Sequence, residues 1–110
     1  MIAWVTHSRQ TVDLGAIPAD TYVMRAHCHV VEAFNSNGTD TVTVGTDADP
    51  DAFVTSIDVS TTGIKSCTLG VRAGHGSASP IKVFYVASGS QPSTGKALII
   101  LETTRTPPQP

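Results

Sequence analysis

Two histidines separated by one residue are the feature of this sequence with the clearest potential for chemistry. His27 and His29 stand in a run of residues with strand character, and alternate residues of a strand point to the same side. Imidazole nitrogens are common ligands of zinc and other transition metals, so the pair is a candidate metal site. The chain offers His7, His75 and Glu32 as further ligands.

The residues around this pair favour a plainer interpretation. Enzymes of the cupin type carry a similar H-x-H pair, but their glutamate follows at a longer distance, and their later element with a further histidine is missing here. Strand parity also places Glu32 on the face opposite to His27. We therefore predict no cofactor, and a strand with one polar or interface-facing side and one core side. The first side comprises Val23, Arg25, His27 and His29, and the second Met24, Ala26, Cys28, Val30 and Phe34.

An acidic segment follows at Asp47, Asp49 and Asp51, with Asp58 further along. Alternating carboxylates of this kind resemble a calcium-binding loop, because calcium prefers hard oxygen ligands. However, Ala52 stands where the EF-hand loop needs glycine for its sharp turn. We predict a solvated turn in which Asp49 caps a single helical turn over residues 51–53.

The sequence carries no recognisable catalytic motif. Ser77 lies in the segment 74–78 (GHGSA), which is not the G-x-S-x-G turn of a serine hydrolase. No phosphate-binding loop or dinucleotide fingerprint occurs either. We therefore expect a protein that is not an enzyme.

Composition predicts one all-β domain over residues 1–110. Thr and Val together account for 27 of the 110 residues, whereas Leu supplies four, and β-branched side chains favour strands. The net charge of −2 includes three Lys and four Arg, too few for a phosphate-binding patch, so we expect no nucleic-acid partner. We also expect no membrane partner and no signal peptide, since no long apolar run is present. Cys28 and Cys67 are expected to be reduced and largely buried.

Alternating patterns and turn residues predict about seven or eight strands, arranged as an antiparallel β-sandwich of the jelly-roll or Greek-key type. Residues 1–11 are expected to form either an extended N-terminal arm or part of the first strand, and residues 105–110 a flexible, proline-rich tail. Asn37 and Gly38 predict a tight hairpin turn, because both residues tolerate a positive φ. The expected strands cover residues 2–14, 22–34, 41–45, 56–59, 65–71, 81–87 and 97–104.

The last two expected strands are apolar on both faces, which indicates that each face is covered by the fold or by a neighbouring subunit. Surplus apolar residues tend to mark contact surfaces. We predict an interface that comprises Trp4, Val5, Ala97, Ile99 and Leu101.

Four segments in order carry a resemblance to a known group of proteins. They are residues 12–19 (VDLGAIPA), 30–35 (VVEAFN), 38–46 (GTDTVTVGT) and 48–53 (ADPDAF). This series resembles small virion proteins of tailed bacteriophages, of the capsid decoration, cement or head-fibre type.

The resemblance implies a β-sandwich that binds the outer face of the phage major capsid protein, often as a homotrimer. It also implies a virion location, with assembly in the host cytoplasm, and it carries over no catalytic residue. Three other roles stay open: a tail, baseplate or fibre-adaptor component, a small carbohydrate- or receptor-binding β-module, and, last, a metal-dependent β-barrel enzyme that uses His27 and His29.

Overall fold

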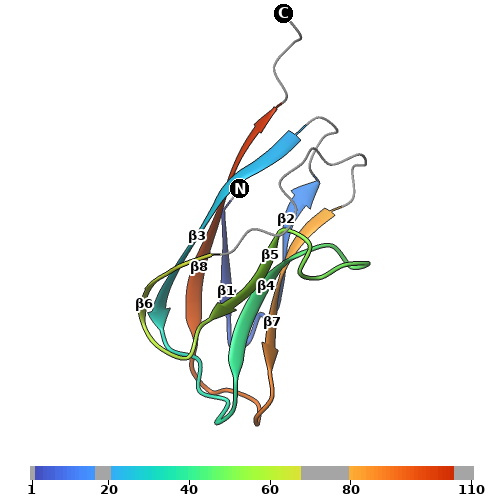
Figure 1. Ribbon diagram of the computed structural model, residues 1–110. Helices are drawn as coiled ribbons and strands as arrows, with labels where there is room; N and C mark the ends of the chain where they lie inside the picture. The colour runs from blue at the N-terminus through green and yellow to red at the C-terminus, as the bar shows by residue number, and fades with distance from the viewer. Residues whose placement is uncertain (1, 17–20, 68–79, 106–110) are drawn as a thin grey trace, which may run out of the picture.

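A computed structural model describes residues 2–16, 21–67 and 80–105 and shows two antiparallel sheets of four strands each (Figure 1). Within the described residues there is no helix, and hence none that could span a membrane. The strands are β1 (Ile2–Thr6), β2 (Thr11–Ala16), β3 (Thr21–Glu32), β4 (Asp40–Gly45), β5 (Val54–Asp58), β6 (Gly63–Lys65), β7 (Pro80–Ala87) and β8 (Lys96–Arg105).

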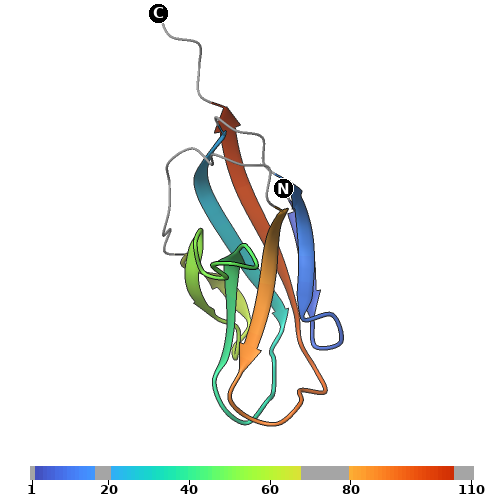
Figure 2. The ribbon, with the colours of Figure 1, turned by 90° about the vertical axis from the view of Figure 1, so that its right-hand side faces the viewer.

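The order of the strands is that of a jelly roll. Sheet A has the order β1-β8-β3-β6, and sheet B has the order β2-β7-β4-β5. The first strand therefore pairs with the eighth, the second with the seventh, the third with the sixth and the fourth with the fifth. Figure 2 shows the two layers, with β4 and β7 in front of β3 and β8. The predicted all-β sandwich is confirmed, and its wiring is the eight-stranded jelly roll.

The core lies between the sheets and follows the alternation that the sequence predicts. In β4, Val42 and Val44 are fully buried while Thr41 and Thr43 lie on the other side. In β3, Cys28 and Val30 point inward, as predicted, and Phe34 is buried just beyond the strand. Apolar side chains from both sheets complete this core: Val5, Val12, Phe53, Val54, Ile57, Val59, Ile81, Val83, Tyr85, Ala97, Ile99 and Leu101.

Of the two alternatives expected for the N-terminal segment, an extended arm or a strand, the structure shows strands. Residues 2–6 form β1, which pairs with β8 from Ile2↔Ile100 to Thr6↔Lys96. Residues 11–16 form β2, which pairs with β7 in the other sheet. The alternation of buried Ala3 and Val5 with exposed neighbours explains why this segment joins the sandwich. Of the predicted tail, Arg105 is the last residue of β8, and residues 106–110 lie outside the described part.

The predicted turn at Asn37 is present, but it does not make a hairpin. Asn37 has a φ of 65°, the left-handed conformation expected of a tight turn. The strands on either side of it, β3 and β4, belong to different sheets. The turn therefore carries the chain from one layer of the sandwich to the other, because a local turn signal fixes the bend and not the partner of the next strand.

The predicted helical turn over residues 51–53 is also wrong. The segment is a non-helical turn in which the Ala52 N–H donates to the Asp49 carbonyl at 3.1 Å. The Phe53 N–H instead donates to the Val44 carbonyl, at 2.9 Å, as the chain enters β5. Burial of the Phe53 ring draws the backbone toward β4 and ends the turn before a helix can form.

Two loops are joined at one end of the sandwich. We call residues 33–39, which follow β3, and residues 88–95, which precede β8, the loop clasp. Asn35 Oδ1 accepts hydrogen bonds from the backbone N–H groups of Ser93 and Thr94, at 2.8 and 3.0 Å. The Ser90 N–H donates to the Ser36 carbonyl at 2.7 Å. These contacts satisfy loop backbone groups and so fix the two layers against each other.

Candidate interaction surface

On the outward side of sheet A, where β3 carries histidines, the other three strands carry large apolar residues. We call these residues the apolar face: Ile2, Trp4, Ile64, Leu98 and Ile100. The register explains why they gather. Ile2 lies beside Ile100, and Trp4 lies beside Leu98, whose other neighbour His29 pairs with Ile64. Paired residues of neighbouring strands point to the same side, so these side chains form one surface.

The apolar face is open to solvent. The exposed fractions are 84% for Ile64, 66% for Ile2 and 42% for Trp4, values that are unusual for large apolar side chains gathered on one sheet. A hollow of about 420 Å³ lies beside Leu98, Ile100 and Ile64, with His27, His29 and Glu102 also lining it. The surface therefore combines protruding apolar groups with a recess.

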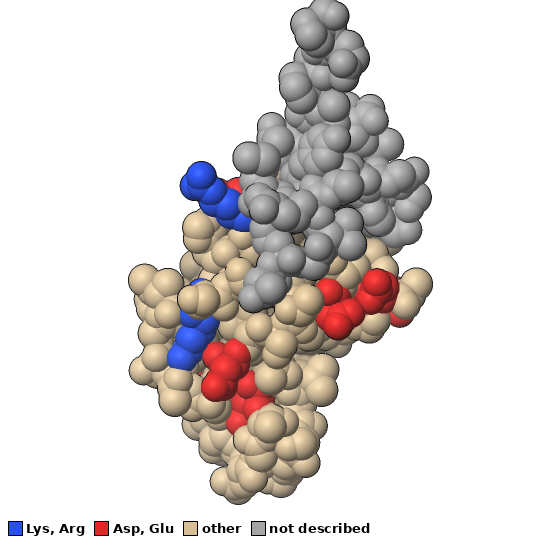
Figure 3. Space-filling view, viewed as in Figure 1, with Lys and Arg blue, Asp and Glu red and all other residues tan. Residues whose placement is uncertain are grey.

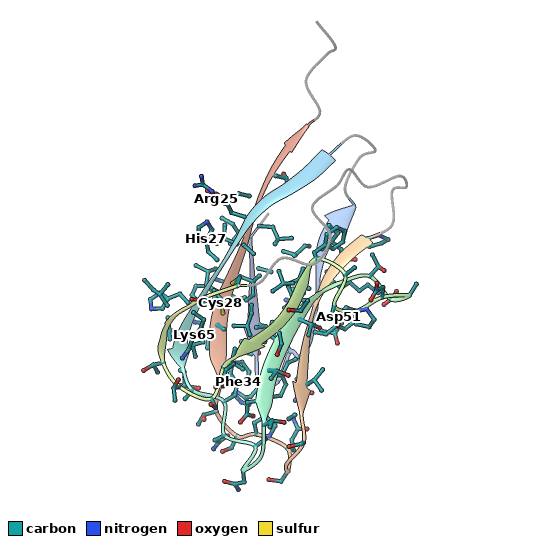
Figure 4. The ribbon with its side chains drawn as sticks, in the orientation of Figure 1. Arg25, His27, Cys28, Phe34, Asp51 and Lys65 are labelled. Atoms are coloured by element: carbon teal, nitrogen blue, oxygen red, sulfur yellow. The ribbon has the colours of Figure 1, made fainter. Side chains whose placement is uncertain are left out.

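Charged residues stand at both ends of the apolar face. At one end, Glu102 of β8 forms an ion pair with Arg25 of β3, with 3.9 Å between Glu102 Oε2 and Arg25 Nε. The same Oε2 lies 3.3 Å from His27 Nε2. Figure 4 shows Arg25 and His27 directed away from the sandwich on the outer side of β3. At the other end, Lys96 of β8 lies opposite Glu32 of β3 in the register of the two strands.

The position of Glu32 corrects the prediction from strand parity. A β-bulge between Val30 and Glu32 adds a residue to β3, so Glu32 comes to lie opposite Lys96. It therefore faces the same side as the histidines and not the opposite one. Glu32 Oε1 accepts a hydrogen bond from the Gly95 N–H at 2.8 Å, and the Lys96 ammonium lies 4.8 Å from the centre of the Trp4 ring.

The outward side of sheet B is different in chemistry. Its central apolar residues, Phe84 and Val86 of β7, stand among hydroxyl and charged groups. Phe84 lies between Thr11 and Thr43, and Val86 lies beside Thr41. Figure 3 views both sheets from the side, and the charged groups visible there form small separate patches of both signs. Of the two outer faces, that of sheet A is the apolar one.

One of the comparisons with known proteins finds the same fold in a solved structure. No protein-family model matches the chain, and no curated protein matches it either. A solved structure with the same fold is a chain of the capsid asymmetric unit of cyanophage Pam1, with a TM-score of 0.65. The match covers 97% of this chain and 84% of that chain, at 12% identity. Such a likeness shows a shared fold, and the coverages mean that the neighbouring chain is only slightly longer.

The predicted interface residues are mostly inside the fold. Val5, Ala97, Ile99 and Leu101 are at most 1% exposed and belong to the core, so the prediction is wrong for these four. On β8 the sequence is apolar on both faces, and the face that points outward is the one that carries Leu98 and Ile100. Trp4 lies on the outer surface, and its part in an interface stays a prediction.

The histidine pair lies as predicted on one side of β3, with both side chains exposed. In the described residues, no group of three His, Cys, Asp or Glu side chains gathers around it in a way that could hold a metal ion. His7 lies instead in the loop after β1, where its Nδ1 is 3.4 Å from the Gly95 carbonyl. His75 and Ser77 fall outside the described residues.

The four carboxylates of the acidic segment do not all point toward one common site. Asp47 forms an ion pair with Lys82 of β7 at 2.8 Å, and this contact raises the pKa of the lysine. Asp58 Oδ1 accepts hydrogen bonds from the N–H and hydroxyl of Ser60, which lower the pKa of Asp58. A hydrogen bond with Asp51 raises the pKa of Asp49. Asp47 and Asp58 thus have partners of their own, while Asp49 and Asp51 contact each other.

Both cysteines are free thiols. Cys28 is buried in the core, and burial raises its pKa to about 12, with a smaller effect from the neighbouring Cys67. Cys67 is half-buried, and burial raises its pKa as well. Neither thiol has the lowered pKa of a reactive cysteine.

Proposed function

We propose that this protein is a non-enzymatic structural component of a tailed-bacteriophage virion, which binds the outer surface of the capsid and stabilises the head. The observation that carries the proposal is the fold likeness to a chain of a cyanophage capsid asymmetric unit, which spans nearly the whole of both chains. That chain is also a small one, as expected of an accessory domain. The four sequence segments that resemble decoration and cement proteins support the same role.

The apolar face of sheet A is compatible with a protein that works as part of a larger assembly. Monomeric proteins rarely expose large contiguous apolar patches, and such patches mark surfaces that a partner buries. The apolar face occupies three of the four strands of sheet A, and the loop clasp at one end holds the two layers in a fixed arrangement. A rigid sandwich with a face to bury suits a protein that joins subunits by contact and performs no catalytic step.

The experiment is a capsid-binding and protection assay. Purified heads of the virus that encodes the chain are depleted of accessory proteins, mixed with the purified protein and separated from unbound protein by sedimentation. We expect saturable binding to the outer surface and a higher temperature of genome release than in the same heads without added protein.

Two outcomes would contradict the proposal. One is the absence of the protein from purified heads by mass spectrometry, and the other is binding that leaves the heat resistance of the heads unchanged. Detection on isolated tails or baseplates alone would replace the head role with the tail-component alternative. Binding to a panel of glycans, with none to heads, would favour the carbohydrate-binding module.

A further inference from the structure

We propose that the apolar face packs against the same face of a second copy of this chain, about a two-fold axis that runs across the strands of sheet A. The product is a symmetric dimer in which the two sheets A form the central layers. This inference goes beyond the capsid role, because the dimer is expected to form in solution when no capsid is present.

We expect a partner to bury the apolar face because this face exposes more large apolar side chains than the outer face of sheet B. Ile2, Trp4 and Ile64 of sheet A are 42–84% exposed, the first two at one edge of the sheet and Ile64 at the other. On sheet B, Phe84 lies between two threonines. Apolar surface gains free energy when it leaves water, and face-to-face packing is the usual way in which sheets bury it.

The charges at the two ends of the face identify the occupant. On β8, Lys96 stands at one end and Glu102 at the other, six residues or about 20 Å away. On β3, Glu32 stands beside Lys96, and Arg25 stands beside Glu102. The sign of the charge is thus reversed along each strand, and it is also reversed between the two strands.

A two-fold axis across the strands places opposite charges over each other throughout. It stacks β8 on β8 and β3 on β3 with their directions reversed, so Lys96 of each copy meets Glu102 of the other. The same operation sets Glu32 over Arg25. A two-fold axis along β8 would instead place Glu102 over Glu102 and Lys96 over Lys96, which repel. An axis along the strands, midway between β8 and β3, would also place opposite charges over each other, but it would set Leu98 over His29 and Ile100 over His27. The charges therefore allow two symmetric arrangements, and the apolar rows choose between them.

The apolar residues fit the axis across the strands. With the axis between the rows of Leu98 and Ile100, Leu98 of one copy lies over Ile100 of the other, and Trp4 lies over Ile2. Ile64, the most exposed large apolar side chain described, then reaches the row of His27, where the hollow of the partner opens. The protruding groups and the recess thus belong to one self-complementary surface.

The test is the mass in solution, measured by sedimentation equilibrium in the absence of capsids. We expect wild-type protein at twice the monomer mass of 11.5 kDa. Leu98→Lys places a charge at the centre of the face and is expected to give a monomer. Val86→Lys is the matched control, since Val86 is 54% exposed on the outward side of β7, an inner strand of sheet B, and it should remain a dimer. Circular dichroism shows that both variants are folded.

A charge exchange tests the direction of the axis. Lys96→Glu and Glu102→Lys should each raise Kd by about tenfold or more, and the double variant should return Kd toward the wild-type value. A wild-type monomer at high concentration, a trimer mass, or a double variant no tighter than the single ones would overturn the proposal. So would a Leu98→Lys variant that keeps the wild-type mass and loses capsid binding, because the face would then belong to the capsid. Failure of capsid binding with an intact dimer would affect the capsid role alone.

Discussion

The phenol of Tyr85 donates a hydrogen bond to the carboxylate of Asp40 inside the sandwich, where the two residues are 7% and 3% exposed. Asp40 also accepts a hydrogen bond from the Ser36 N–H at 3.2 Å, and the Phe34 ring stacks on Tyr85 with 4.6 Å between centroids. Asp40 begins β4 and Ser36 lies in the loop clasp. A single buried carboxylate therefore joins the clasp to the centre of sheet B.

Removal of the single oxygen atom of the Tyr85 phenol should clearly lower the stability of the protein. Tyr85→Phe leaves the buried Asp40 carboxylate without one of its donors, and we expect a loss of about 1–3 kcal/mol in the free energy of unfolding. Urea denaturation monitored by circular dichroism measures it. Ser56→Ala, which removes an exposed hydroxyl from β5, should change the same quantity by less than about 0.5 kcal/mol. Equal effects of the two variants would contradict the buried hydrogen bond.

The same pair predicts a dependence of stability on pH in the alkaline range. Burial, and then the hydrogen bond to Asp40, raises the pKa of Tyr85 from 10.0 to about 12. The folded state thus favours the neutral phenol, so this contribution to stability is complete below pH 10 and is lost as the pH rises from about 10 to about 12. Titration of tyrosinate absorbance should show a late-ionising group that Tyr85→Phe removes. A Tyr85 that ionises near pH 10 in protein that is still folded would contradict the prediction.

Gly95 should tolerate substitution less well than another glycine with a similar backbone. It has a φ of 145°, and a Cβ at this position would overlap the Phe34 ring. Gly63 has a φ of 121°, but a Cβ there would meet no atom within 4 Å. Gly63→Ala therefore reports backbone strain alone, while Gly95→Ala adds an overlap, and we expect a further loss of about 1–3 kcal/mol in unfolding free energy. Equal losses would show that the Phe34 ring moves aside freely.

The two cysteines should differ in their reactivity toward alkylating reagents. The thiolate is the reactive form, and burial raises the pKa of Cys28 to about 12. At about pH 8 we expect iodoacetamide to modify the half-buried Cys67 first, and Cys28 only when the protein unfolds. Peptide mass spectrometry over time measures both rates. In denaturant the two rates should converge, and rapid modification of Cys28 in native protein would contradict its placement in the core.

The strands and the sandwich could be predicted from the sequence because their causes are local. Alternation of Val42 and Val44 with threonines marks a strand that is buried on one side, wherever its partners lie. The same reasoning placed Cys28 and Val30 in the core and the histidines outside it, as the structure has them. A β-bulge, in contrast, reverses parity without a distinctive residue, and this is why the side of Glu32 was missed.

The interaction surface could be predicted only in part. Leu98, Ile99, Ile100 and Leu101 are apolar without interruption, so β8 offers two equivalent faces and periodicity cannot choose between them. The choice is made by pairing over a long distance, since β1 fixes the register of β8 from the other end of the chain. Ile64 was missed for a related reason. It stands in the three-residue β6, and its place beside His29 depends on tertiary pairing.

The nested pairing of the strands also has a consequence for the order of events during synthesis. β8 is made last of the eight, yet it lies between β1 and β3 in sheet A. Until β8 is made, the strand that lies between β1 and β3 is missing, so β3 has β6 as its one available neighbour in sheet A and the sheet stays incomplete. Closure of contacts between distant parts of a chain is slow, typically milliseconds to seconds in all-β domains. We therefore expect this protein to become protease-resistant only after release of β8, in one late step.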